Sequence, residues 1–126
     1  GKGGVHMTIA SFRDLEIWKL GKDIVVEVYR ATGLFPKNEV YGLVAQMRRA
    51  SVSIPSNVAE GFNRFHNKEY RQLLYAALGS CAELETQVEI ATELGYLEVK
   101  LRDQLIEKLD HETRMIRNLV KKLQVA

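Results

Sequence analysis

The sequence is poor in cysteine, proline and tryptophan, and its net charge is small. It has one cysteine, two prolines and one tryptophan among 126 residues, with a formal net charge of +2. A single thiol excludes an internal disulfide; Cys81 lies in an apolar helical run, so we expect a small buried core residue in a cytoplasmic protein. Few prolines and no low-complexity tract argue against long disorder. The small net charge by itself indicates no class of partner.

Membrane and targeting segments are also lacking. Unbroken apolar runs fall well short of the roughly 20 residues that span a bilayer, so we expect no membrane segment. The opening GKGGVH precedes Met7 and lacks the framing of a phosphate-binding loop. We expect residues 1–6 to be the remnant of an expression tag and residues 7–126 to form a single domain.

Motifs that would indicate catalysis or metal binding are missing as well. His66 and His111 belong to neither an HExxH nor a Glu-x-x-His pattern. The serines of residues 51–56 have no GxSxG context and no histidine near them in sequence. We therefore expect no catalytic residue, no metal site, no cofactor and no enzymatic activity.

Helical periodicity fills the rest of the chain. Apolar residues recur at steps of three and four, which predicts helices over about 11–33, 38–61 and 67–94 and from 97 onward. We expect Gly33 and Gly95 to end helices, with Gly33 in the left-handed conformation, and Val40 to begin the apolar stripe of the second helix. Connections of four to seven residues favour antiparallel neighbours. The fold expected is an all-α, up-down-up-down antiparallel four-helix bundle.

The segment QMRRASVSIPSNVAEGFNR, residues 46–64, places a proline inside the second helix. Pro55 removes a backbone donor and should kink the helix by more than about 20°, and Gly61 should end it. Polar residues at helical spacing form one face of this helix: Arg49, Ser53, Asn57, Glu60 and Arg64. That face is either solvated or a polar seam against a neighbouring helix or subunit, for which Glu83 of the third helix is a possible counterpart.

Charge is distributed unevenly along the chain. Residues 46–72 hold five basic and two acidic side chains, residues 83–112 hold three basic and nine acidic, and residues 113–126 hold four basic and none acidic. The last group either opposes the dipole at a helix end or belongs to a patch that binds a polyanion. The candidate phosphate contacts are Arg48, Arg64, Lys68, Arg71, Arg117, Lys121 and Lys122. Tyr70 and Phe65 are candidates for stacking on bases.

Two segments carry a family resemblance. QMRRASVSIPSNVAEGFNR followed by EYRQLLYAALGSCAELETQVEIATELGYL resembles the four-helix-bundle protein family encoded in bacterial 23S ribosomal RNA intervening sequences, and FRDLEIWKLGKDIVVEVYRATGLFPKNEVYGL is similar to that family's first helix and turn. The likeness covers residues 12–97, and its most specific part is SIPSN-x-AEG-x-x-R. Val58, where isoleucine is common, and Cys81, where a larger apolar residue is usual, are minor departures.

The resemblance implies a homopentameric ring associated with structured RNA or other nucleic acid, without established enzymatic activity. Accessory proteins of diversity-generating retroelements are similar in fold, and they bind nucleic acid and a reverse transcriptase. Two functions are therefore expected. The first is a nucleic-acid-associated scaffold; the alternative is a protein–protein adaptor, such as an accessory subunit for a reverse transcriptase.

Overall fold

Four long helices make up most of the protein. The computed structural model describes residues 9–125, and residues 1–6, the expected tag remnant, lie outside this range. The helices are α1 (Glu16–Thr32), α2 (Leu43–Phe62), α3 (Asn67–Glu93) and α4 (Val99–Val125), with short 3₁₀ turns at Phe12–Asp14 and Lys37–Glu39. No strand occurs between residues 9 and 125, so the expected all-α class is confirmed.

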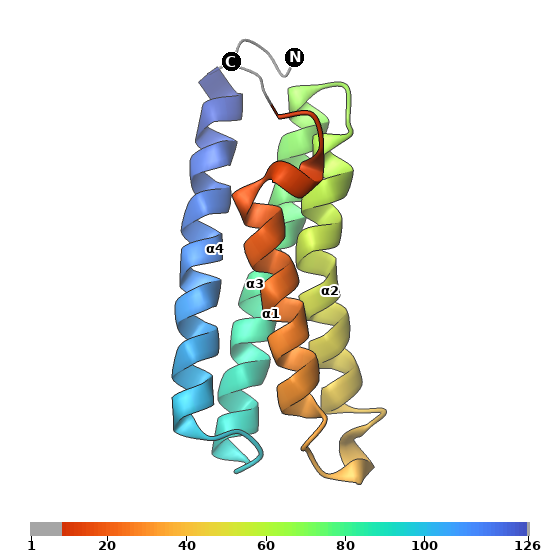
Figure 1. The fold of residues 1–126 in the computed structure, drawn as a ribbon, viewed down its shortest axis with the longest axis vertical. Helices are drawn as coiled ribbons and strands as arrows, with labels where there is room; N and C mark the ends of the chain where they lie inside the picture. The colour runs from red at the N-terminus through yellow and green to blue at the C-terminus, as the bar shows by residue number, and fades with distance from the viewer. Residues whose placement is uncertain (1–8, 126) are drawn as a thin grey trace.

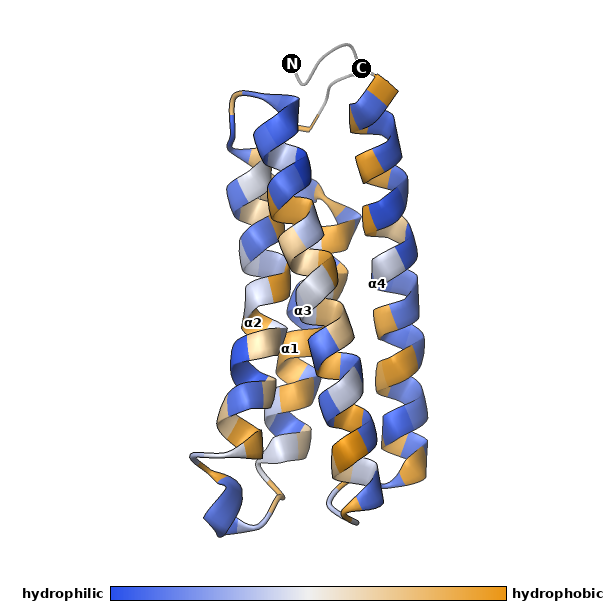
Figure 2. Cartoon of the chain, turned by 180° about the vertical axis from the view of Figure 1, so that it is seen from behind, coloured by the Kyte–Doolittle hydropathy of each residue, from blue (hydrophilic) through white to orange (hydrophobic). Residues whose placement is uncertain are grey.

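The helices pack side by side, and their connections alternate between the two ends of the bundle (Figure 1). The α1–α2 and α3–α4 connections lie at one end, and the α2–α3 connection lies at the other end, together with the end of α4. Hydrophobic and hydrophilic residues alternate in bands along each helix (Figure 2), as expected when one face of a helix is buried and the other is solvated.

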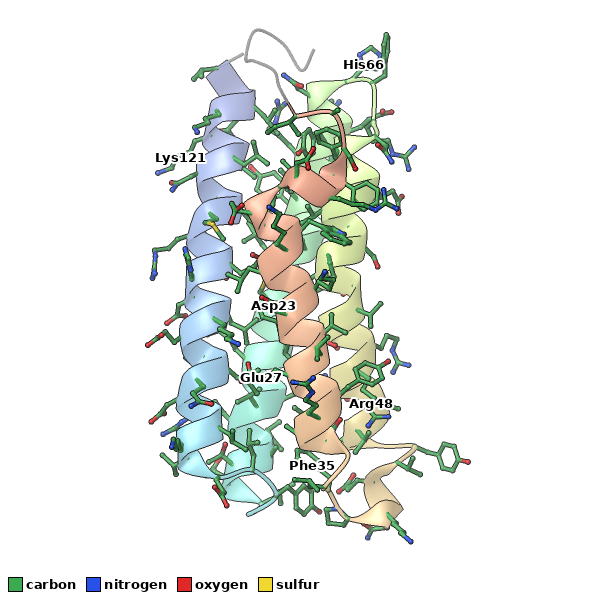
Figure 3. All side chains as sticks on the ribbon, in the orientation of Figure 1. Asp23, Glu27, Phe35, Arg48, His66 and Lys121 are labelled. Atoms are coloured by element: carbon green, nitrogen blue, oxygen red, sulfur yellow. The ribbon has the colours of Figure 1, made fainter. Side chains whose placement is uncertain are left out.

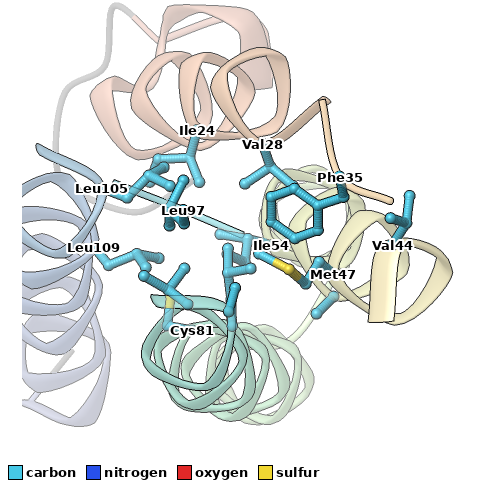
Figure 4. Packing of buried hydrophobic residues seen from close by; sticks show 14 residues of the cluster. Ile24, Val28, Phe35, Val44, Met47, Ile54, Cys81, Leu97, Leu105 and Leu109 are labelled. Atoms are coloured by element: carbon cyan, nitrogen blue, oxygen red, sulfur yellow. The ribbon is translucent and has the colours of Figure 1, made fainter. Parts of the chain in front are cut away.

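The core consists of two apolar clusters, one in each half of the bundle. The first contains Ile24, Met47, Ile54, Leu84 and Leu105, and is drawn in Figure 4. The second, toward the α2–α3 connection, contains apolar residues of all four helices: Ile17, Val58, Phe62, Tyr70, Leu74, Ala77, Ile116 and Val120. Cys81 is buried in the first cluster, as expected. Burying each large aliphatic side chain contributes about 1.5–3 kcal/mol.

The start of α2 differs from the prediction. The helix begins at Leu43, not at residue 38 or 39, and Val40 lies outside it with 49% of its surface exposed. Glu39 accounts for this start: its Oε1 accepts a hydrogen bond from the backbone N–H of Leu43 (3.2 Å), and its Oε2 accepts one from the Tyr96 hydroxyl (2.9 Å). The side chain therefore satisfies one of the free N–H groups at the helix start.

The helix ends predicted at Gly33 and Gly95 are confirmed, since α1 ends at Thr32 and α3 ends at Glu93, whereas the left-handed conformation of Gly33 and the helix end at Gly61 were wrong. Gly33 has φ −62°, a right-handed conformation, whereas Gly95 has φ +79° after the end of α3. Gly61 does not stop α2, which continues to Phe62. It is instead a point of close packing, because a Cβ atom at Gly61 would lie 2.8 Å from Cδ1 of Tyr70.

Pro55 lies inside α2 without interrupting it. Its ring is buried against Gly21 of α1, where a Cβ atom would lie 3.3 Å from the proline Cβ. Side chains on both sides of the proline bind backbone carbonyls: Ser53 Oγ donates to the carbonyl of Ala50 (2.8 Å), and Asn57 Nδ2 donates to the carbonyl of Ser53 (2.8 Å). These bonds hold the turn in which proline removes a donor; the kink itself stays a prediction.

Candidate nucleic-acid interface

Most of the predicted phosphate-binding residues lie at the end of the bundle that holds the α2–α3 connection. We call this the basic end and define it by Arg64 in that connection, Lys68 and Arg71 at the start of α3, and Lys121 and Lys122 in the last turns of α4. Figure 3 shows His66 and Lys121 near this end, with Phe35 and Arg48 toward the other.

A hydrogen bond joins the two parts of the basic end. Nη1 of Arg71 donates to the backbone carbonyl of Leu123 at 3.0 Å, so the start of α3 is tied to the last turn of α4. Because carbonyls at a helix C-terminus lack intrahelical donors, this contact also satisfies one of them. Arg71 is half-buried, whereas Lys68, Arg117, Lys121 and Lys122 are exposed. Arg117 lies one turn before Lys121 on α4.

Arg48 does not belong to the basic end. Its Nε donates to Thr32 Oγ1 (3.0 Å), its Nη2 donates to the carbonyl of Tyr29 (3.4 Å), and its guanidinium lies 4.4 Å from the centre of the Tyr29 ring. The side chain therefore packs over the last turn of α1, where a cation also opposes the helix dipole. The contact joins α1 to α2, and its span of 16 residues along the chain left no local signal in the sequence.

The two aromatic candidates have opposite environments. Phe65 is 93% exposed in the α2–α3 connection. Tyr70 is 5% exposed, and its ring packs edge-on against Phe62 at 6.4 Å between ring centres. Burial raises the pKa of Tyr70 to about 12. The expectation that Tyr70 stacks on bases is therefore wrong, because its ring has no free face. The ring of Phe65 does have a free face.

Tyr75 is an aromatic residue that the sequence reasoning missed. It is half exposed on α3, and its hydroxyl accepts a hydrogen bond from Gln124 Nε2 of α4 at 3.4 Å. The sequence could have indicated that Tyr75 is exposed, because it follows Leu74 directly and so lies outside the apolar stripe of Leu74, Ala77 and Cys81.

The polar face of α2 divides between internal and outward contacts. Ser53 Oγ is also hydrogen-bonded to Ser80 Oγ of α3, which ties the two helices together. Glu60 and Arg64 form an exposed ion pair of 2.9 Å, and Arg49 is exposed. Glu83 is exposed on α3 and accepts from Gln87 of its own helix at 3.4 Å, and no hydrogen bond to α2 is described for it. Ser53 and Asn57 therefore serve the subunit itself, while Arg49 and Glu60 lie on its surface.

Acidic side chains gather in the other half of α3 and α4. Arg102 binds Glu89 (3.0 Å) and Asp103 (2.7 Å) there. Burial, followed by the neighbouring Asp110, raises the pKa of Glu85. Since residues 83–112 carry nine acidic and three basic side chains, the α3–α4 pair is acidic in one half and basic at the opposite end.

Glu112 is the most unusual titratable group in the core. It is fully buried, and neither carboxylate oxygen has a hydrogen-bond partner among the described residues. A Cβ atom on Gly21 would lie 3.1 Å from Oε2, so the carboxyl fits beneath that glycine. Burial raises its pKa to about 8. A glutamate within the apolar series of Leu109 and Ile116 was the sequence signal for this site.

The other groups that could support chemistry are dispersed. Burial raises the pKa of the Cys81 thiol to about 12, which favours the unreactive protonated form. His66 and His111 are both exposed, on different elements. Within residues 9–125, no group of three or more histidine, cysteine, aspartate or glutamate side chains is arranged to hold a metal ion. In the same range, no helix combines the length and apolarity needed to cross a membrane.

Together, these features define a small, all-α four-helix-bundle protein with one basic end. The chain belongs to the 23S rRNA-intervening sequence protein family, whose model matches residues 13–118. Its structure is similar to that of a protein of unknown function from the S23 ribosomal protein family of Bacteroides thetaiotaomicron, with a TM-score of 0.77 and 15% identity over 83% of this chain and 98% of that one. No curated protein matches the sequence. The family resemblance is thus confirmed.

Proposed function

We propose that this chain is a non-enzymatic, self-associating protein that binds RNA or DNA through its basic end. The observation that carries the proposal is the segregation of charge: Lys68, Lys121 and Lys122 are exposed at one end, and the acidic half of α3 and α4 lies at the other. A polyanion is attracted to the first and repelled by the second, so the charge pattern orients it.

Phosphate contact is the form of recognition that this surface supports. Lysine side chains on helix termini are long, flexible cations that neutralise phosphates without reading a base sequence. Binding of this kind releases counterions and weakens steeply as salt is added. We therefore expect an affinity for RNA or DNA that depends strongly on salt and weakly on sequence.

We further propose that the protein assembles as a homopentamer, as the family resemblance implies. The outer surface of α1 and α2 supports self-association, because Val26 and Val52 expose apolar surface and line a groove together with Trp18 and Pro55. A closed ring repeats one contact around its axis and would carry one basic end per subunit. Light scattering would contradict the assembly if it found only the 14.3 kDa monomer at micromolar concentration.

A pair of charge-reversed variants tests nucleic-acid binding. Lys121→Glu with Lys122→Glu removes two cations from the basic end; Lys37→Glu with Lys100→Glu makes the same change in charge at exposed positions of the other end. Fluorescence anisotropy with labelled RNA and DNA should show a large loss for the first pair and a small change for the second. Equal losses, or binding that is unchanged between low and moderate salt, would contradict the proposal.

The adaptor function remains the second candidate, and the acidic half of α3 and α4 favours it, because residues 83–112 carry nine acidic and three basic side chains. A protein partner, such as a reverse transcriptase, would dock there without using the basic end. Pull-down from the source cells with and without nuclease distinguishes the two functions. Partners lost after nuclease treatment support the nucleic-acid scaffold, and partners that are retained support the adaptor.

A further inference from the structure

Phe65 stands out among the exposed apolar residues of the basic end. Its ring is 93% exposed, so it contributes almost nothing to the core. Its described ring contact is with His66, edge-on, at 5.2 Å between ring centres. A phenylalanine that buries so little surface gains little stability for the fold, and its free face is available to another molecule.

The connection that carries Phe65 is braced at both sides. The backbone N–H of Arg64 donates to the carbonyl of Gly61 at 3.0 Å, and that of Tyr70 donates to the carbonyl of His66 at 3.1 Å. Beneath the connection, the close approach of Gly61 to Tyr70 packs the end of α2 against the start of α3. The ring is therefore held out on a short turn with ordered ends, which lowers the entropy lost on binding.

The surroundings of Phe65 indicate the chemistry of its partner. Arg64 and Lys68 flank the ring in sequence, with Glu60 paired to Arg64 (2.9 Å) and Glu69 in the first turn of α3. The last turns of α4, tied to this end by Arg71, add exposed Lys121 and Lys122. A ligand with both negative charge and flat aromatic faces matches this combination, and nucleic acid has both.

We propose that Phe65 is a base-stacking platform, through which the basic end binds single-stranded nucleic acid in preference to duplex. A ring can stack only on a base whose face is open, and bases within a duplex are covered on both faces. The cations supply attraction for either form, so the preference for single strands depends on Phe65. This inference rests on the proposed function and adds the strandedness of the ligand and the residue that selects it.

Tyr41 provides a matched control at the other end of the bundle. It is 94% exposed in the α1–α2 connection, so its side chain is as accessible as that of Phe65. Removing either ring should leave the core intact. Only Phe65 lies at the basic end.

The experiment compares anisotropy titrations of a labelled oligouridylate of about 12 nucleotides with titrations of a blunt duplex of equal length. Phe65→Ala should weaken single-strand binding by about 5- to 150-fold and duplex binding by less than about twofold. Phe65→Trp should restore single-strand binding, and its added indole fluorescence should be quenched by the oligonucleotide but not by the duplex. Tyr41→Ala should bind both probes as the wild type does.

The outcomes separate the inference from the proposed function. Equal affinity of the wild type for both probes, or equal losses for both in Phe65→Ala, would overturn the stacking role while leaving the basic end as a phosphate-binding surface. Binding of neither probe by the wild type would overturn the proposed function, and the stacking role with it. Circular dichroism of each variant checks that the bundle is intact.

Discussion

At the residue scale, the buried Glu112 makes the stability of the fold depend on pH. Its pKa of about 8 is raised from an ordinary value of 4.5 because burial disfavours the charged carboxylate. The folded protein therefore binds this proton more tightly than the unfolded chain does. The resulting stability is fully present below the unfolded pKa, decreases as pH rises toward 8, and is lost once pH exceeds the folded pKa.

We predict that the free energy of unfolding decreases by about 5 kcal/mol between acidic pH and pH above 8 because of Glu112. Urea denaturation followed by circular dichroism across this range would measure the change. Glu112→Gln keeps the shape and removes the charge, so its free energy of unfolding should decrease less over the same interval. Burial also raises the pKa of Glu85, but Glu85 is present in both proteins, so the difference between the two profiles isolates Glu112. Parallel profiles would contradict the prediction.

Two glycines give a second prediction at this scale, because their surroundings differ. A Cβ atom on Gly61 would meet Tyr70 at 2.8 Å and Leu73 at 3.3 Å, whereas a Cβ atom on Gly79 would meet nothing within 4 Å. Gly61→Ala should therefore lower the free energy of unfolding by about 1–3 kcal/mol through overpacking. Gly79→Ala, in the middle of α3, should raise it by up to about 1 kcal/mol through helix propensity. Thermal denaturation compares the two, and a loss of equal size in both would refute the packing argument.

At the element scale, the start of α2 depends on Glu39. Its carboxylate receives hydrogen bonds from the backbone N–H of Leu43 and from the Tyr96 hydroxyl. Glu39→Ala leaves that N–H unsatisfied and should lower the free energy of unfolding by about 0.5–2 kcal/mol. Glu39→Gln keeps an accepting oxygen and should lose less. Hydrogen exchange of the first turn of α2 should accelerate in Glu39→Ala, and unchanged exchange there would show that the bond does not hold the helix start.

The same element shows what the sequence could and could not predict. Apolar spacing was sufficient for the existence of α2, since Met47, Ile54 and Val58 form one buried stripe. Its start was mispredicted because apolar spacing does not show that the Glu39 carboxylate, which also binds Tyr96 57 positions away, accepts a hydrogen bond from the N–H of Leu43. Gly61 was mispredicted for a related reason. Glycine is typical of a helix end, but here the close packing of α3 against Gly61 explains why the residue is a glycine.

In the candidate site, too, local patterns were predictable from the sequence and contacts between distant residues were not. The cations of α4 were visible as a run without acidic residues, and their exposure agrees with that pattern. Which aromatic ring is free was not visible, because local sequence does not show that the folded chain covers Tyr70 and leaves Phe65 exposed. The prediction that Arg48 contacts phosphate was wrong because its hydrogen bond to Thr32 forms only when α1 and α2 pack together, and local sequence does not show that contact.

At the scale of the whole molecule, the outward part of the α2 polar face connects one subunit to the proposed assembly. Arg49 is exposed, and Glu60 forms an exposed pair with Arg64. Surface ion pairs of this kind contribute about 0–1 kcal/mol to the free energy of unfolding, so this pair stabilises the single chain very little. If the face is a seam between subunits, the same charges become buried on assembly, and removing one partner there costs about 3–5 kcal/mol.

We predict that Arg49→Ala and Glu60→Ala weaken assembly without unfolding the subunit. Light scattering over a dilution series should show smaller species for both variants at concentrations where the wild type is assembled. The free energy of unfolding of the dilute subunit should change by less than about 1 kcal/mol, because both positions are solvated in the single chain. Lys100→Ala, an exposed cation in the acidic half, is the control and should assemble normally. If both variants assemble as the wild type does, the polar face of α2 is solvated in the assembly. The contact between subunits would then be expected on the apolar surface of α1 and α2.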